Sequence, residues 1–266
     1  MADRDTRCLL AVHAHPDDET LTTGGTLARY AAEGVRTVVV TCTGGELGLP
    51  GNRAQELRAA ADVLGISRLV QLGYLDSGMP GAPENHRPGA FHAVETIQAA
   101  EKLASVLEQE RPQVVVTYDE TGGYGHPDHV KAHHVTVAAC RRFSNARLYF
   151  VSFPLGWSRR FVAELRRAGI PAPGSAPAGA DAGPDVEEIG VPDARVTTRI
   201  DVRAYVEKKR AALACYPSQI GPDHFLSQAP MDLLNDLWAY EFFERARRPR
   251  REEDDLFAWT RHAAGR

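Results

Sequence analysis

Short apolar runs that alternate with helical patterns constrain the fold of this chain more than any other feature of its sequence. Residues 8–12, 35–43 and 113–118 are rich in apolar and β-branched side chains, and each run opens into a polar joint and then an amphipathic stretch. Strand, helix and strand joined by short connections are typical of a parallel sheet. The sequence therefore predicts an α/β fold: a Rossmann-like, mostly parallel sheet flanked by helices, with C-terminal additions.

The other expected elements continue this alternation. Two further strands are expected over residues 68–74 and 147–153. Apolar residues at helical spacing predict helices over residues 21–33, 52–64, 91–110 and 128–143. The pattern loosens beyond residue 154, where we expect a strand over 195–202 and helices over 204–215 and 231–247.

We expect one domain over residues 1–266, with a core over about 8–153, a C-terminal part over about 154–247 and a polar tail after it. The segment 170–184 is rich in Pro, Gly and Ala, which predicts a surface flap or a linker.

Composition excludes several classes of protein. The chain has 31 Lys and Arg against 35 Asp and Glu, a formal net charge of −4, so nothing indicates a nucleic-acid-binding surface. The first residues lack the apolar core of a signal peptide, and no stretch reaches the roughly 18 apolar residues of a membrane span. The four cysteines form no Cys-x-x-Cys pair, which favours reduced thiols. We expect a cytoplasmic protein with no nucleic-acid or membrane partner. The sequence leaves open whether the chain forms a homo-oligomer.

Ionisable residues gather in the joints after the first and fourth expected strands. His15, Asp17 and Asp18 follow the first strand, and Gly122-Gly123-Tyr124-Gly125-His126-Pro127-Asp128-His129 follows the fourth. In a sheet with the common strand order 3-2-1-4-5, both joints line one crevice. The first cluster alone could be a harmless surface turn. Charges beside a buried strand nevertheless cost free energy unless they are paired or bind a metal.

Imidazole and carboxylate are the ligands expected of a catalytic zinc ion, which takes three protein groups and leaves a position for water. His15 and Asp18, with one histidine of the second cluster, would supply them. Asp17 could take the proton of the water, and a second histidine, held by an acid such as Asp128, could protonate the leaving group. The pair His129 and His133 also has zinc-ligand spacing, but it leaves the first cluster unused.

These motifs resemble the PIG-L/LmbE-like N-acetylglucosaminyl deacetylase family, which includes the mycothiol-pathway deacetylase and the mycothiol S-conjugate amidase. The resemblance covers residues 8–240, roughly. Its marks are Ala14-His15-Pro16-Asp17-Asp18-Glu19, Thr41-x-Thr43-x-Gly45-Glu46, Arg53-x-x-Glu56 with Leu64-Gly65, Asp76-Ser77-Gly78-Met79, and the stretch from Gly122 to His129. A His-Pro-Asp-Asp motif paired with a distant His-Pro-Asp-His motif is a strong signal.

The resemblance implies a metal site and a general base. Zinc, with Fe²⁺ as the alternative ion, would bind His15, Asp18 and His129. Asp17 would be the base. The site would lie at the carboxyl edge of the sheet.

The resemblance also implies groups that handle the substrate. His126 would stabilise or protonate the leaving amine, with Asp128 orienting it, and Tyr124 would reach the tetrahedral oxyanion. Arg53 and Asp76 match positions that grip hydroxyls of the sugar or inositol.

The implied reaction is hydrolysis of the acetamide of an N-acetylglucosaminyl small molecule to a free amine and acetate. The substrate would be a thiol precursor, a conjugate or a natural-product glycoside. One alternative is an amidase that removes a larger acyl group from an amino sugar, as in the mycothiol S-conjugate type. The other is a non-catalytic Rossmann-like module that binds a sugar or nucleotide, although the first joint lacks a Gly-x-Gly-x-x-Gly fingerprint.

One position departs from the family. Many relatives carry a histidine just before a Ser/Thr-Gln pair, and the matching stretch here has Tyr216. We expect this change to affect substrate identity more than the metal chemistry.

Beside the first cluster, His13 is expected to be a buried core residue and Glu19 to cap the first helix. Trp157 and Trp238 are expected to be packing residues.

Overall fold

A seven-stranded sheet forms the centre of the computed structural model, which describes residues 7–48, 51–142, 145–171, 189–222, 224–249 and 251–259. The strand order is β3-β2-β1-β4-β5-β7-β6. The first five pair in parallel, whereas β7 is antiparallel to both β5 and β6. The α/β fold and the strand order 3-2-1-4-5 are therefore confirmed. The strands are β1 (Cys8–His13), β2 (Arg36–Thr43), β3 (Arg68–Tyr74), β4 (Val114–Tyr118), β5 (Arg147–Val151), β6 (Thr198–Asp201) and β7 (Tyr240–Arg245).

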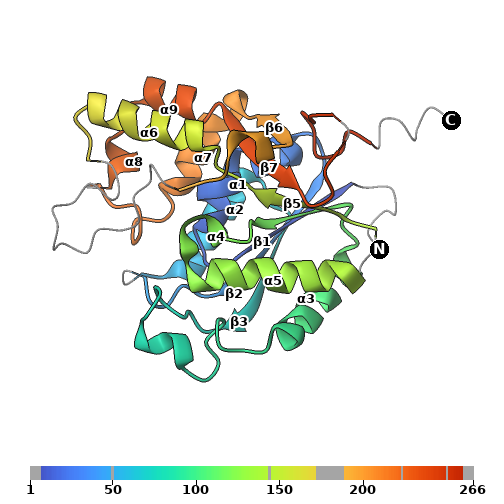
Figure 1. Cartoon of the computed structure of the whole chain (residues 1–266). Coiled ribbons are helices and arrows are strands. Elements are labelled where there is room, and N and C mark those ends of the chain that lie inside the picture. The colour runs from blue at the N-terminus through green and yellow to red at the C-terminus, as the bar shows by residue number, and fades with distance from the viewer. Residues whose placement is uncertain are drawn as a thin grey trace.

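Helices cover both faces of this sheet (Figure 1). On one face lie α3 (Thr96–Glu110) and α5 (Pro127–Arg142), which pack against each other. The other face carries α1 (Asp18–Ala32), α2 (Arg53–Leu64) and α7 (Val206–Leu213).

Strand β1 supplies apolar side chains to both layers. Leu10 and Val12 belong to the core beneath α3 and α5, while Leu9 and Ala11 belong to the core beneath α1. A strand that is buried on both faces reads as a continuous apolar run, which is the pattern seen in the sequence.

The C-terminal part adds a group of helices beside the carboxyl edge of the parallel strands. These are α6 (Leu155–Arg167), α8 (Phe225–Gln228) and α9 (Met231–Leu237), which gather at the upper left of Figure 1. They share a core of their own, in which Phe161, Leu165, Leu226 and Leu234 are buried. The short helix α4 (Gly122–Gly125) and the 3₁₀ turns η1 (Pro83–His86), η2 (Asp193–Arg195) and η3 (Arg203–Tyr205) complete the elements described.

The predicted helix over residues 231–247 is wrong in its second half. Helix α9 ends at Leu237, and the chain then forms β7. Glu241 and Phe243 are buried on alternate positions of this strand, which is the period of a sheet and not of a helix. The strand forms because residues 240–245 pair with β5 and β6, partners far away in sequence.

Several predicted boundaries shift for local reasons. Helix α3 begins at Thr96 and not at residue 91, because Phe91 N donates to Leu75 O and continues the edge of the sheet. Helix α1 begins at Asp18, three residues earlier than predicted. Strand β6 is shorter than residues 195–202. Of the segment 170–184, only residues 170 and 171 are described, so the predicted flap or linker lies outside the described residues.

Strands from the C-terminal part extend the same sheet as the core, and we therefore propose that the chain is the single domain predicted. In the part of the chain that is described, no helix has the length and apolar character needed to cross a membrane. All four cysteines are free thiols.

Candidate active site

The joint between β1 and α1 turns sharply at Asp17. This residue has φ 106° and ψ −34°, in the region that favours glycine, and helix α1 begins immediately after it. Its backbone N–H donates to the carboxylate of Glu19, with N to Oε2 at 3.0 Å. The turn brings His15 and Asp18 together, since His15 N also donates to Asp18 Oδ2 at 2.9 Å.

The joint between β4 and α5 is shaped by a carboxylate and by glycine. Asp119 Oδ1 accepts from Thr121 N at 2.9 Å and from Gly123 N at 3.1 Å, which closes the loop after the strand. Gly122 has φ 67°, and a Cβ there would lie 2.7 Å from Cβ of His129. Only glycine allows this close approach, which sets His129 at the start of α5.

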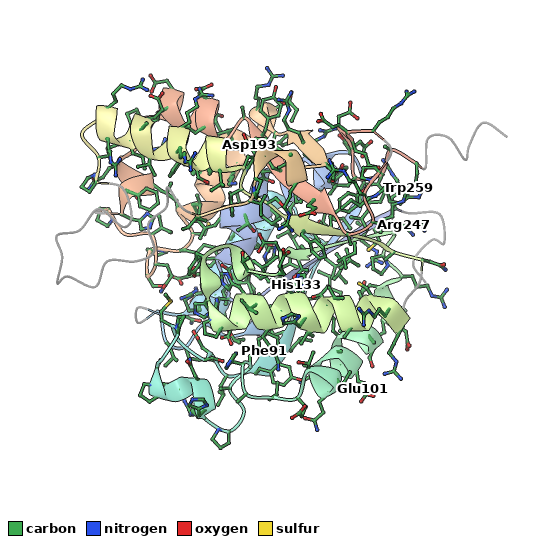
Figure 2. The ribbon with its side chains drawn as sticks, in the orientation of Figure 1. Phe91, Glu101, His133, Asp193, Arg247 and Trp259 are labelled. Atoms are coloured by element: carbon green, nitrogen blue, oxygen red, sulfur yellow. The ribbon has the colours of Figure 1, made fainter. Side chains whose placement is uncertain are left out.

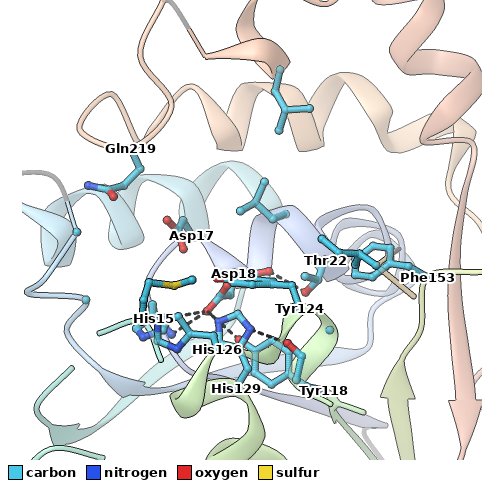
Figure 3. A pocket seen from close by; sticks show the side chains of 18 of the residues that line it. His15, Asp17, Asp18, Thr22, Tyr118, Tyr124, His126, His129, Phe153 and Gln219 are labelled. Carbon is cyan, nitrogen blue, oxygen red and sulfur yellow. Dashed lines mark hydrogen bonds and ion pairs between the residues drawn. The ribbon is translucent and has the colours of Figure 1, made fainter. Parts of the chain in front are cut away.

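His15, Asp18 and His129 meet at one buried point (Figure 3). Asp18 Oδ2 lies 3.3 Å from His15 Nδ1 and 3.4 Å from His129 Nε2. The ring of His126 is 4.6 Å from that of His15 and 4.9 Å from that of His129, centroid to centroid. Nitrogen atoms of the three histidines all lie within 4.8 Å of one another. The two predicted clusters are thus brought into one site.

Hydrogen bonds on the far sides of two rings fix where their protons sit. His129 Nδ1 lies 3.1 Å from Gly122 O, a pure acceptor, so Nδ1 carries the hydrogen and Nε2 presents a lone pair. His15 Nε2 lies 3.2 Å from Asp128 Oδ2, which likewise leaves Nδ1 bare when the ring is neutral. Both nitrogens face Asp18 Oδ2, so the space between them takes either a proton on the ring or a bound cation.

The loop after β3 supports this centre from behind. Asp128 is fully buried, and its Oδ2 accepts from Ser77 N at 2.9 Å as well as facing His15. Asp76 Oδ1 lies 3.6 Å from His15 Nε2 and accepts from Gly78 N at 2.9 Å. The carboxylate of Asp128 therefore orients His15, whereas the sequence assigns it to His126. Asp128 contacts His126 through its backbone instead, since Asp128 N donates to His126 Nδ1 at 3.2 Å.

Burial and neighbouring charges drive the pKa values of these groups apart. Burial, and then the charge of Asp18, raise the pKa of Asp17 well above its usual value. Burial acts in the same direction on Asp18, but His129 and His15 outweigh it and hold the pKa of that carboxyl well below its usual range. Burial and the adjacent histidines lower the pKa of His126 to about 4. Two neighbouring carboxyl groups with opposite shifts are typical of a site that divides ligand and proton-transfer roles between them.

Arg53 is engaged with the first joint. Its guanidinium Nη2 lies 3.0 Å from Asp17 Oδ2 and also donates to Pro16 O. Arg53 therefore holds the Asp17 carboxylate, in addition to any contact with the sugar that the sequence assigns to it.

A cavity of about 490 Å³ opens above the histidine cluster. All the predicted site residues line it except Asp128. Tyr124 stands at its rim with 40% of its surface exposed, and Figure 3 shows Asp17 beside the histidine cluster and not within it.

One wall of the cavity is apolar, and this apolar wall consists of Phe153, Trp157, Phe161, Phe225, Leu226 and Trp238. The rings of Trp157 and Phe161 stack with centroids 5.1 Å apart. Trp157 Nε1 donates to Leu237 O at 2.8 Å, so its polar atom is used inside the protein. Trp157 and Trp238 were predicted as packing residues, and they also face the cavity.

Two residues of the site escape sequence reasoning. Tyr118 ends β4, its hydroxyl donates to Asp18 Oδ2 at 2.7 Å, and its ring stacks on His129 with centroids 4.2 Å apart. Gln219 comes from the C-terminal part and lines the cavity together with Arg53. The position of Tyr118 at the carboxyl end of a central strand is the one signal that could have identified it.

Three residues near the motifs lie outside the cavity lining. His13 is buried and meets Thr23 Oγ1 at 3.1 Å, as expected for a core residue. His133, carried by α5 (Figure 2), places Nδ1 2.9 Å from Tyr118 O, so the His129 and His133 pair is not assembled. Tyr216 is fully buried and does not line the cavity. Tyr216 therefore has no direct access to the cavity, and the expected effect of this position on substrate identity stays a prediction.

The chain is similar to known proteins along most of its length. Residues 10–140 match the family model described as PIG-L, GlcNAc-PI de-N-acetylase. A 1D-myo-inositol 2-acetamido-2-deoxy-alpha-D-glucopyranoside deacetylase of Thermobifida fusca (strain YX) is 40% identical over an alignment of 291 positions, gaps included, that covers 95% of this chain and 99% of that relative. The protein of the same description from Saccharomonospora viridis is 42% identical and covers 94% and 99%. A solved structure of a conserved protein from Thermus thermophilus is 26% identical, with a TM-score of 0.56, over 90% of this chain and 94% of that one.

Proposed function

Because this chain belongs to the PIG-L family and is a hydrolase of an amide bond, we propose that it removes the acetyl group from an N-acetylglucosaminyl small molecule with the aid of a bound divalent metal ion. The observation that carries the proposal is the convergence of His15, Asp18 and His129 on one buried point beneath an open cavity. The products are a free amine and acetate. The glucosaminyl-inositol named in the two relatives is the first substrate to test.

The side chains at this point fit a metal ion. His129 Nε2 is buried and makes no hydrogen bond within the described residues, although it faces a carboxylate. His15 Nδ1 faces the same oxygen, and a carboxylate bonded to the far nitrogen of a ligand histidine is the usual support for such a ligand. We therefore assign the metal to His15, Asp18 and His129. Zinc suits this donor set, and Fe²⁺ is the alternative. When bound, such an ion supplies Lewis acidity that polarises a carbonyl and acidifies water.

Asp17 is the base in this proposal. Its carboxylate lines the cavity next to the ligand Asp18, and Arg53 holds one of its oxygens. This leaves the other oxygen to accept the proton of the attacking water. Replacement of Asp17 by Asn should keep the metal and lower the rate by roughly 10²–10⁴-fold. If the Asp17→Asn variant keeps full activity, another residue must be the base.

His126 and Tyr124 face the departing and developing charges. His126 Nδ1 accepts from Asp128 N, so the neutral ring keeps its hydrogen on Nε2 and can donate a hydrogen bond to the leaving nitrogen, while the proton that Asp17 takes from the attacking water goes to that nitrogen. The hydroxyl of Tyr124 is assigned to the oxyanion, because this residue stands at the rim of the same cavity. Arg53 and Asp76 are assigned to hydroxyls of the substrate, beside the protein contacts they already make.

A second candidate is an amidase that removes a larger acyl group from an amino sugar. The apolar wall favours it, because an acetyl group alone would leave most of that surface uncovered. Comparing amine release from N-acetyl, N-butyryl and N-phenylacetyl derivatives of one glucosaminide separates the two. A preference for the acetyl compound supports the deacetylase.

The decisive experiment combines metal analysis with a substrate panel. The purified protein should contain close to one zinc or iron per chain and release free amine from N-acetylglucosaminyl compounds. His129→Ala should lose the metal and the activity, while His134→Ala, an exposed residue on the same helix, should keep both. A protein that binds no metal, and whose acetate release survives His15→Ala, would refute the proposal.

We place the reaction in the cytoplasm, because the four cysteines are free thiols and reduced cysteines are typical of that compartment.

A further inference from the structure

Glu19 is fully buried yet lies outside the cavity lining. Its two carboxylate oxygens are used differently. Oε2 accepts the backbone N–H of Asp17 at 3.0 Å. Oε1 accepts the hydroxyls of Thr20 at 2.5 Å and of Tyr216 at 2.7 Å. Glu19 therefore does more than cap a helix, since it joins the turn at Asp17 to a residue of the C-terminal part.

The Asp17 backbone needs such support. A residue other than glycine with φ 106° is strained by about 1–3 kcal/mol and persists only where the surroundings hold it. Two groups hold it here: Glu19 from the amide side, and Arg53 through Pro16 O and the Asp17 carboxylate. If one is loosened, the turn can relax and carry the Asp17 carboxylate away from the ligand Asp18.

Tyr216 is placed to fix Glu19 rather than to touch a substrate. It follows α7, and its ring packs in the core formed by Ala28, Leu57 and Leu64. The rigid ring carries its hydroxyl to a carboxylate 197 residues earlier in the chain. Without this hydroxyl, Oε1 of Glu19 would keep only the bond from its sequence neighbour Thr20.

We propose that Tyr216 is a positioning residue for the reaction: its hydroxyl holds Glu19, and through Glu19 it holds the strained turn that sets the Asp17 carboxylate. The proposal rests on the proposed function, in which Asp17 is the base. In this proposal Tyr216 acts on the base through Glu19 and has no contact with the metal ligands. A residue with that role can lie behind the cavity, as Tyr216 does.

The test is removal of the hydroxyl alone. Tyr216→Phe should lower kcat for an N-acetylglucosaminide about tenfold, with KM and metal content unchanged, because a misplaced catalytic group costs rate and not binding. Tyr30→Phe is the matched control: Tyr30 lies on α1, is fully buried, and donates to a carboxylate, Asp255 Oδ1 at 2.8 Å, outside the cavity. Its hydroxyl also accepts from Leu256 N at 2.7 Å, so Tyr30→Phe should lower Tm at least as much and leave kcat unchanged.

A double-mutant cycle tests the route through Glu19. If Tyr216 acts through this carboxylate, Tyr216→Phe should cost little further rate in a Glu19→Gln background, since coupled residues are not additive. Equal effects of Tyr216→Phe and Tyr30→Phe on kcat, or fully multiplicative effects in the cycle, would overturn the proposal.

A crystal structure of Tyr216→Phe gives a readout that needs no substrate. The backbone of Asp17 should leave the positive-φ region or become disordered, and an unchanged φ would contradict the inference. An unmodified protein that releases no amine would instead refute the proposed function, so the two failures are distinguishable.

Discussion

A buried ion pair between α7 and β7 allows a sharp prediction about stability. Lys209 Nζ on α7 lies 2.8 Å from Glu241 Oε1 on β7, and their side chains are only 4% and 5% exposed. The same carboxylate accepts from Gly25 N at 2.9 Å and from Thr26 N at 2.8 Å on α1. One side chain therefore satisfies donors from two helices.

Glu241→Ala should remove most of what this contact contributes. Breaking a buried ion pair by deleting one partner costs about 3–5 kcal/mol, because the remaining charge stays buried and unpaired. The amides of Gly25 and Thr26 also lose an acceptor, at about 1–3 kcal/mol for each donor left unsatisfied. We expect the free energy of unfolding to fall by at least about 3 kcal/mol, a large fraction of the roughly 5–15 kcal/mol typical of a domain.

Urea unfolding followed by circular dichroism measures this change, with Glu244→Ala as the control. Glu244 lies on the same strand and pairs with Arg195, whose side chain is 34% exposed, so its loss should cost only about 0–1 kcal/mol. If Glu241→Ala lowers the stability by less than about 1 kcal/mol, the cost typical of an exposed pair, then the buried carboxylate does not stabilise the packing of α7 and α1 on β7 and the reasoning fails.

Three further predictions concern the metal, the packing of α1 and the thiols. Dialysis against a chelator should abolish amine release, and added Zn²⁺ should restore it, as followed by a free-amine assay. Gly25→Ala should lower Tm although Ala favours helices by about 1 kcal/mol, because the new Cβ would lie 2.7 Å from Val202 Cβ. Gly24→Ala should cost less, because its new Cβ would come no closer than 3.2 Å, to Cγ of the flexible Lys209 side chain. A thiol reagent at pH 8 should modify Cys215 first, since burial raises the pKa of Cys8 to about 11 and that of Cys140 to about 12; fast reaction of Cys8 in the native protein would contradict this.

Much of the fold could be predicted because its rules are local. The apolar runs mark the parallel strands, and Asn52 and Gly65 mark the ends of α2, where Asn52 accepts from Gln55 N and Gly65 has φ 79°. Residues 240–245 could not be predicted in this way. Their aromatic side chains fit a helical period as well as a strand, and only pairing with β5 and β6 decides between the two.

The candidate site, like the fold, could be predicted from the sequence only in part. Strand order brings the joints after β1 and β4 together, so His15, Asp18 and His129 could be expected to meet. The partners of individual side chains could not be predicted, because they depend on how side chains from segments a hundred or more residues apart in the sequence are oriented toward one another. The Asp128 carboxylate faces His15 and not His126, and the hydroxyl of Tyr118 reaches Asp18.

The place of β7 in the sheet has a consequence for synthesis of the chain. The last strand to leave the ribosome inserts between β5 and β6, so the edge of β5 stays open until about residue 245 has emerged. Until then β6 has no neighbour within the sheet, and an open edge is a site for pairing with another nascent chain. Chains stopped just before β7 should therefore depend on chaperones and aggregate.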